Sequence, residues 1–407
     1  MREKQKPAKG FLFAGINVAI KRNGKNDLGL ILSETEASAA AVFTANLFQA
    51  APVLISRSRV RSGKARAILV NSGNANCGTG SDGLKAALKT GAALAKHLRI
   101  REWSVLLAST GVIGEPLPFQ KIINGIPRLV SCASTQGFED FETAIMTTDT
   151  KKKISCRAVK MAGKEVRILG LAKGAGMIQP QMATMLAFVL TDARVKSHAL
   201  ARLLKESVDT SFNRITVDGD TSTNDTLFAL ANGASRVSLA PGKPGWMNFS
   251  KAIKEVCLEL AGMIAADGEG ASRWFYVQAR GAKTRADAEK IARRIANSPL
   301  VKTAISAADP NWGRIIAAAG ISGAKFNVQK TSLYLISADG RRRLEILKRG
   351  ARSLKYRGRA RENTAARLLS ESGFRILFDA GQGQGDFEML TCDFTQEYVK
   401  LNAEYRS

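Results

Sequence analysis

The chain has 407 residues, 45% hydrophobic and 24% charged, which is typical of a folded globular protein large enough for two domains. No apolar run approaches the roughly 20 residues that span a bilayer, so the composition excludes a helical membrane protein. The formal net charge of +26 would attract phosphate backbones or small anions.

The N-terminus, MREKQKPAKGFLFAGINVAI, has the basic start and short apolar run of a signal peptide, but no cleavage pattern follows it. We therefore expect a first strand and a cytoplasmic protein. The cysteines form no close pair, which predicts neither a CxxC metal site nor a disulfide framework: they are Cys77, Cys132, Cys156, Cys257 and Cys392.

Apolar runs and helical patterns alternate along the chain, which predicts a mixed α/β protein. Strands are expected at 65–70, 103–109, 166–172 and 185–191, and helices at 199–212 and 248–266. A helical pattern from residue 285 opens a new α/β stretch. We accordingly expect a large α/β domain over residues 1–275 and a smaller α/β domain over residues 276–407.

Six long polar runs follow apolar segments and are typical of loops that surround a ligand. The first, NSGNANCGTGSDG, precedes a helix and could form an anion nest, although it lacks a nucleotide-binding motif. DGDTSTNDT begins like a calcium loop but has Thr223 and Ala229 where glycine and glutamate are required, so a hydrogen-bonded structural loop is expected. The six runs are 71–83, 108–118, 146–150, 217–226, 267–272 and 308–314.

Two further features bear on function. Residues 341–361 carry ten lysines and arginines against one acid, Glu345, but match no nucleic-acid motif, which favours a solvated basic face. The two histidines, His97 and His198, both fall in helical patterns. A Ser-His-Asp site or a histidine-rich metal site is therefore not expected, and a nucleophile would need another base.

The stretch GAGMIQPQMATML supplies such a nucleophile. Gly174, Gly176 and Pro180 permit a tight backbone before Thr184, which enters an apolar strand. A threonine hydroxyl held against the preceding carbonyl can take the Ala183 acyl group from nitrogen to oxygen. Hydrolysis of the ester would leave Thr184 as a new N-terminus, whose amino group, with a pKa of about 7.7–8.0, can act as the base for its own hydroxyl.

Nine motifs in order then identify a resemblance. They resemble the ornithine acetyltransferase family of arginine biosynthesis, from about residue 9 to the end. The motifs are VFTANLFQAAPV, NSGNANC, STGVIG, MTTDT, KGAGMIQPQMATMLAF, SFNRITVDGDTSTNDT, DGEGA, DPNWGR and the terminal TCDFTQEYVKLNAEYRS. The resemblance implies an N-terminal-nucleophile-like layered sandwich domain. It implies self-cleavage between Ala183 and Thr184, giving chains 1–183 and 184–407 that assemble as an α2β2 heterotetramer.

The resemblance also implies the reaction. Thr184 would take the acetyl group of N2-acetyl-L-ornithine and pass it to L-glutamate, as a glutamate N-acetyltransferase. Some members also use acetyl-CoA as donor, which is amino-acid N-acetyltransferase activity. No metal and no bound cofactor are implied.

Matching positions imply the roles of single residues. Thr110 and Gly111 would form the oxyanion hole, with a hydroxyl and a backbone N–H aimed at the developing charge. Substrate contacts would come from Thr147, Lys173, Thr184, Glu269, Asn402 and Ser407. Lys173 could also lower the pKa of the freed amino group by charge repulsion.

Two rival functions stay open. A self-processing aminopeptidase would share the nucleophile and use water as acceptor, so glutamate would not accelerate its turnover. A basic nucleic-acid-binding protein would bind in a strongly salt-dependent way and tolerate Thr184→Ala. The motifs favour the acetyltransferase, with no membrane or nucleic-acid partner.

Overall fold

The computed structural model describes residues 6–161, 163–179 and 185–404. The chain divides into two compact units, the first comprising Met1–Asn213 and Asp220–Ile264 and the second Arg214–Gly219 and Ala265–Ser407. The division falls somewhat before the predicted boundary at residues 275 and 276, because the loop before Trp274 and the strand formed by 215–216 pack with the second sheet.

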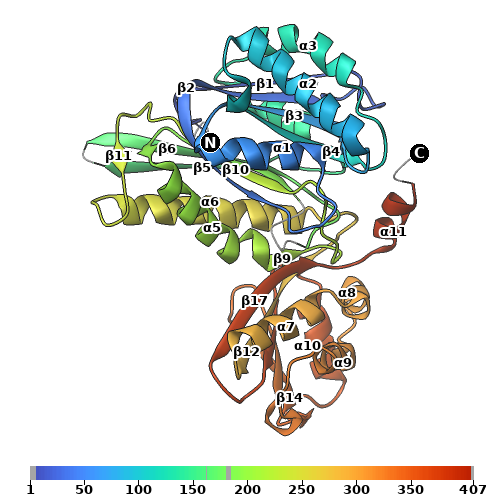
Figure 1. Cartoon of the computed structure of the whole chain (residues 1–407). Helices are drawn as coiled ribbons and strands as arrows, with labels where there is room; N and C mark the ends of the chain where they lie inside the picture. The colour runs from blue at the N-terminus through green and yellow to red at the C-terminus, as the bar shows by residue number, and fades with distance from the viewer. Residues whose placement is uncertain (1–5, 162, 180–184, 405–407) are drawn as a thin grey trace. The chain divides into compact units, whose positions relative to one another are not determined.

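The first unit is built on an eight-stranded mixed sheet in the order β4-β3-β2-β10-β7-β6-β5, with β1 paired to β2 (Figure 1). The pair β3–β4 is parallel, as is β7–β10, whereas β6 runs antiparallel to β7. All four predicted strands are confirmed as β3, β4, β6 and β7, although residues 103–104 form a 3-10 turn before β4 and residue 185 lies just before β7. The strands are β1 Phe11–Ile16, β2 Leu28–Phe43, β3 Lys64–Asn74, β4 Val105–Val112, β5 Lys153–Met161, β6 Lys164–Lys173, β7 Leu186–Thr191 and β10 Thr226–Ala231, and a separate small sheet pairs β8 Arg194–Val195 with β11 Ser238–Leu239.

Helices flank the layered strands, with α1, α2 and α3 beyond one half of the sheet and α5 and α6 beyond the other (Figure 1). Their bounds are α1 Ala51–Arg59, α2 Gly80–Leu98, α3 Phe119–Ser131, α4 Phe138–Ile145, α5 Ser197–Thr210 and α6 Trp246–Ala266. The helices predicted at 199–212 and 248–266 are thus confirmed as α5 and α6. Small residues let α2 approach closely: its buried face holds Ala86, Ala87 and Gly91, while Leu84 and Leu88 are partly exposed.

One aromatic-rich cluster in this unit joins strands from both halves of the sheet. Phe188 of β7 and Phe228 of β10 are fully buried beside Phe141 of α4, whose ring meets that of Phe188 at 5.1 Å between centroids. A second cluster joins β2 and β3 to α1, α2 and α3. Helices thus lie outside and strands inside, which confirms the predicted layered α/β architecture.

The second unit has a seven-stranded sheet in the order β15-β14-β13-β16-β12-β17-β9. Its strands are β9 Ile215–Thr216, β12 Trp274–Ala282, β13 Ser332–Ile336, β14 Arg343–Lys348, β15 Ala351–Arg352, β16 Arg375–Asp379 and β17 Gly385–Cys392. Its helices are α7 Arg285–Ala296, α8 Pro299–Ser306, α9 Trp312–Gly320, α10 Arg359–Leu369 and α11 Gln396–Ala403. The predicted helix from residue 285 is confirmed as α7, capped by the Thr284 hydroxyl, which accepts from the Asp287 N–H.

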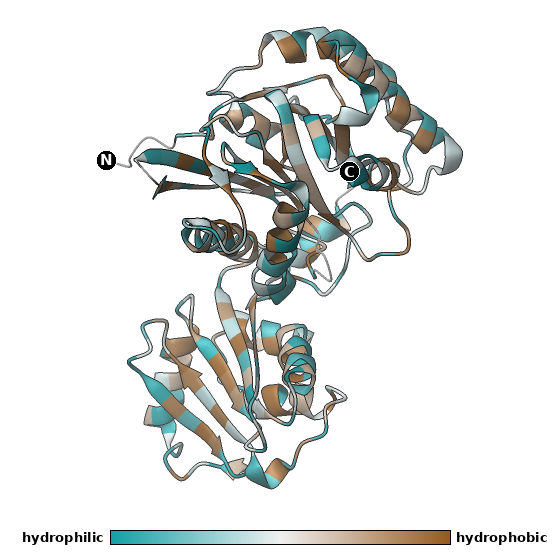
Figure 2. Ribbon diagram, turned by 60° about the vertical axis from the view of Figure 1, so that its left-hand side comes forward, coloured by the Kyte–Doolittle hydropathy of each residue, from teal (hydrophilic) through white to brown (hydrophobic). Residues whose placement is uncertain are grey.

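Side chains alternate along these strands between a buried and an open face, as the brown and teal bands in Figure 2 show. Leu333 and Leu335 of β13 join the core under α7–α10, whereas Tyr334 between them is half-buried on the other face. The open face is polar; for example, Arg375 of β16 pairs with Glu388 of β17 at 2.6 Å.

Candidate active site

Lys173, the last residue of β6, links two predicted site residues of the first unit. Its ammonium group donates to the Thr147 hydroxyl at 2.8 Å and to the Thr110 hydroxyl at 3.2 Å. Only 7% of Lys173 is exposed, so these contacts are sheltered from water, which strengthens them. The structure thus brings Thr110, Thr147 and Lys173 together from three separate segments.

Gly111 follows Thr110 in β4 and occupies a conformation that other residues rarely adopt, with φ of 133°. A Cβ atom here would lie 2.3 Å from the carbonyl carbon of Gly73 and 2.5 Å from the backbone nitrogen of Asn74, in the paired strand β3. The close approach of the two backbones therefore requires glycine at this position, next to the Thr110 hydroxyl.

Asp149 ties the end of β6 to the loop that carries Thr147. Its carboxylate pairs with Nζ of Lys153 at 2.8 Å and with Nζ of Lys173 at 3.7 Å. It also accepts from the backbone N–H of Gly174 at 2.5 Å and of Thr147 at 3.1 Å. Burial opposes its ionisation, but the two lysines and these hydrogen bonds outweigh burial and hold the pKa of Asp149 below its ordinary value. Asp149 is thus an anion that positions Lys173 and Thr147.

Glu142 of α4 is a buried carboxyl group beside this cluster. Its Oε1 accepts from the backbone N–H of Lys153 at 3.0 Å, while its Oε2 has no hydrogen-bond partner in the part of the chain that the structure describes. Burial raises the pKa of Glu142 to about 8, so the group is mostly protonated at neutral pH. The sequence analysis missed it, although a signal exists: Glu142 shares the apolar face of α4 with Phe138 and Ile145 at helical spacing.

Asp225 is a second buried carboxyl group that the sequence analysis missed. It directly precedes β10, and its carboxylate accepts from the backbone N–H of Met185, the residue after Thr184. Thr226 in turn donates its N–H to the Met185 carbonyl at 3.0 Å. Burial raises the pKa of Asp225 well above its ordinary value, and its Oδ2 has no hydrogen-bond partner among residues 6–161, 163–179 and 185–404. The only sequence signal was its place in the polar run 217–226.

The chain before the predicted cleavage point is tightly turned. Gly174 has a φ of 150° and Met177 a φ of 56°, whereas Gly176 stays outside the left-handed region. Ile178 forms an isolated bridge with Thr221, whose hydroxyl donates to the Gln179 carbonyl at 2.8 Å. The expected constrained backbone is thus present at Gly174. Pro180, Ala183 and Thr184 lie outside the described residues, as does Ser407.

Glu269 and Asn402 meet within the second unit. Nδ2 of Asn402 on α11 donates to the Glu269 carboxylate at 2.9 Å. The Thr395 hydroxyl, which caps α11, also donates to the Gly270 carbonyl at 2.6 Å. Gly270 has a φ of 65°, and a Cβ atom there would lie 2.4 Å from the backbone nitrogen of Tyr398. The predicted pair is therefore held by close docking of α11 on the loop 267–272.

Much of the polarity of the predicted ligand loops serves the backbone. Asn224 donates to the carbonyls of Ala75 at 2.6 Å and Ser109 at 2.9 Å, which joins the runs 71–83 and 217–226. Asn76 likewise donates to the Gly83 carbonyl at 3.0 Å. These amides hold the loops that flank Thr110 and Gly111 in place.

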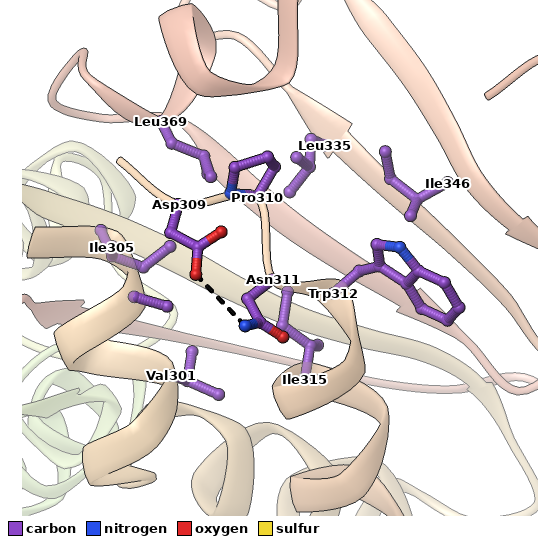
Figure 3. Close-up of a pocket in the computed structure, with 11 residues that line it drawn as sticks. Val301, Ile305, Asp309, Pro310, Asn311, Trp312, Ile315, Leu335, Ile346 and Leu369 are labelled. Carbon is purple, nitrogen blue, oxygen red and sulfur yellow. Dashed lines mark hydrogen bonds between the residues drawn. The ribbon is translucent and has the colours of Figure 1, made fainter. Parts of the chain in front are cut away.

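The run 308–314 lies in the second unit and borders a small pocket (Figure 3). Asn311 donates to the Asp309 carboxylate at 3.2 Å at its edge. The remaining wall is apolar, with Val301, Ile305 and Leu335 among its side chains. A polar ligand would need polar groups in the wall, so the expectation that this run surrounds such a ligand is not supported. The loop packs against the core instead.

His97 and His198 are both exposed on the surface. No group of histidine, cysteine and acidic side chains among residues 6–161, 163–179 and 185–404 is arranged to hold a metal ion. Over the same residues, no helix is both long and apolar enough to cross a membrane. All five cysteines are free thiols.

Comparison with known proteins places the chain in a family. The sequence model of the ArgJ family matches residues 12–407. The arginine biosynthesis bifunctional protein ArgJ of Desulfotalea psychrophila is 44% identical over 400 residues, 98% of this chain and 99% of the relative. Its counterpart in Thermotoga neapolitana is 45% identical over 402 residues, with the same coverage.

Two solved structures are also similar to this chain in sequence. The crystal structure of ArgJ from Bacillus halodurans is 39% identical, with a TM-score of 0.49 over 54% of this chain and 99% of that chain. The ornithine acetyltransferase of Mycobacterium tuberculosis, complexed with ornithine, is 32% identical, with a TM-score of 0.39 over 44% of this chain and 97% of that chain. From the match over residues 12–407 and the relatives that align with nearly the whole sequence, the chain belongs to the ArgJ family.

Proposed function

We propose that this chain is an arginine-biosynthesis acetyltransferase that moves the acetyl group of N2-acetyl-L-ornithine to L-glutamate through an acetyl ester on Thr184. The single observation that carries the proposal is the Lys173 ammonium group bound to both the Thr110 and the Thr147 hydroxyl in a chain of the ArgJ family. The relatives are bifunctional proteins, which supports a second activity, and acetyl-CoA would be its acetyl donor.

The chemistry begins with self-cleavage between Ala183 and Thr184, which frees the α-amino group of Thr184. That amino group takes the proton of the Thr184 hydroxyl as the oxygen attacks the acetyl carbonyl. The Thr110 hydroxyl and the Gly111 N–H would stabilise the resulting oxyanion, and the nearby Lys173 cation favours the same charge. Ornithine leaves with the proton, and the amine of glutamate then attacks the ester and regenerates Thr184.

The remaining predicted residues would recognise the substrates. Ornithine and glutamate each offer a carboxylate and an ammonium group, which suit a lysine, a glutamate and neutral hydrogen-bond donors. Thr147, Lys173, Glu269, Asn402 and Ser407 form this set. We further propose an α2β2 assembly of chains 1–183 and 184–407 that works without a bound cofactor.

The test compares wild type with Thr184→Ala and Thr184→Ser. Intact mass should show two fragments, 1–183 and 184–407, in the wild type and one chain in Thr184→Ala. The serine variant keeps a hydroxyl and serves as the matched control, with slower cleavage expected. Acetylornithine turnover should then depend on glutamate. Uncut wild-type protein would refute the nucleophile, and turnover that is indifferent to glutamate would indicate a hydrolase.

A further inference from the structure

The basic segment 341–361 borders a pocket on the open side of the second unit, with a volume of about 350 Å³. Its wall is formed by β13, β14, the loop after β15 and the first turn of α10. The polar lining side chains are Tyr334, Arg343, Glu345, Lys355, Tyr356 and Arg361. The site described above uses none of them.

The pocket concentrates positive charge that the protein does not neutralise. Arg343, Lys355 and Arg361 form no ion pair within the part of the chain that the structure describes. By contrast, Arg342 pairs with Glu371 at 2.6 Å and Arg352 with Glu362 at 3.0 Å in the same segment. The pocket therefore holds three unpaired cations against the single carboxylate of Glu345, which accepts from the Ser353 hydroxyl at 2.7 Å.

Two tyrosines shape the wall around this charge. The Arg343 guanidinium lies 4.0 Å from the ring centroid of Tyr334, which restrains its position. Tyr356 is only 2% exposed and belongs to the core of the unit, so its ring is a fixed part of the wall.

Backbone geometry at the start of α10 also favours an anion. Gly358 caps this 11-residue helix with a φ of 81°, and Arg361 lies in the first turn. The N–H of Arg361 is bonded to the Gly358 carbonyl at 3.1 Å, so it is the helix dipole at this end that attracts negative charge. This effect has the same sign as that of the three cations in the pocket wall.

We propose that this pocket binds a small molecule that carries a phosphomonoester group. A phosphate ester has a charge of about −1.5 to −2 at neutral pH, which complements three cations opposed by one carboxylate. Arginine forks also match phosphate oxygens geometrically. The volume lies within the range of small-molecule sites, about 300–1,000 Å³. The proposal does not depend on the acetyl-transfer function.

The experiment measures binding to the full-length protein by calorimetry, with inorganic phosphate and AMP as probes and adenosine as the uncharged control. CoA and dephospho-CoA form a second matched pair, because only CoA carries a phosphomonoester. The test variant is Arg343→Gln/Lys355→Gln/Arg361→Gln. The control, Lys348→Gln/Arg357→Gln/Arg367→Gln, removes the same charge from exposed residues outside the pocket lining. Acetyl transfer and melting temperature check that both variants fold.

We expect saturable binding of AMP but not adenosine, weakened at least about tenfold in the test variant and little changed in the control variant. Tighter binding of CoA than of dephospho-CoA would identify CoA as a source of the group, and equal binding with retained AMP affinity would point to another phosphomonoester. Absence of saturable phosphate or AMP binding would overturn the proposal. Equal weakening in both variants, with binding of single-stranded oligonucleotides, would instead indicate an extended nucleic-acid surface and also overturn it.

Discussion

Replacing Asp149 by asparagine tests whether this carboxylate holds the candidate active site together. In the wild type, Nζ of Lys153 lies 2.8 Å from the Asp149 carboxylate. The change leaves this buried ammonium group without that charged partner. It also removes one of the two acceptors that bind the Gly174 and Thr147 N–H groups. Breaking a buried ion pair by removing one partner costs about 3–5 kcal/mol.

At about 2–4 °C per kcal/mol for a domain of this size, the melting temperature should fall by at least about 6 °C. Glu139→Gln is the matched control, because it removes an exposed partner of Lys152 at 3.2 Å and should cost at most about 1 kcal/mol. Adding Lys153→Met to Asp149→Asn should recover part of the loss, since the buried charge is then gone.

The pH dependence gives a second check on the same variant. The pKa of Asp149 is depressed in the folded protein, so its stabilising effect is present above the unfolded value of about 3.9 and is lost as the pH falls towards the folded value. The difference between wild type and Asp149→Asn should therefore shrink below about pH 4. Equal melting temperatures for Asp149→Asn and Glu139→Gln at neutral pH would refute the reasoning.

Three further predictions concern the same unit. Gly111→Ala places a Cβ atom 2.3 Å from backbone, so kcat for acetyl transfer should fall about 10²–10³-fold, and a fall of less than tenfold would contradict the close packing. Glu142→Gln should gain melting temperature relative to wild type as the pH rises from about 4.5 to 8. Burial raises the pKa of Glu142 to about 8, so the folded protein keeps the proton over that range while the unfolded chain releases it, and the wild type loses stability; a constant difference would contradict this. We propose that the Lys173 cation lowers the pKa of the freed Thr184 amino group. Lys173→Met should therefore move the acid limb of the pH–rate profile to higher pH, and an unchanged profile would disprove that role.

The sequence alone predicted much of this protein. Apolar runs located the cores of β3, β4, β6 and β7, and helical spacing located α5, α6 and α7, because both patterns reflect local burial. The ordered motifs predicted the family, which the match over residues 12–407 confirmed. The proposed nucleophile, Thr184, also came from local chemistry: a lone hydroxyl after a turn-rich segment, in a chain without a histidine base.

Only the tertiary structure decided which groups meet. Thr110 and Lys173 are 63 positions apart, and β4 and β6 are not neighbours in the sheet. Their contact arises because the two halves of the sheet pack face to face around one core cluster, which no local pattern encodes. The ionisation states of Asp149, Glu142 and Asp225 likewise depend on burial and on distant neighbours. In Glu142 burial prevails and favours the neutral acid, whereas in Asp149 two lysines outweigh burial and favour the anion. Charge in a protein interior is thus a property of the fold.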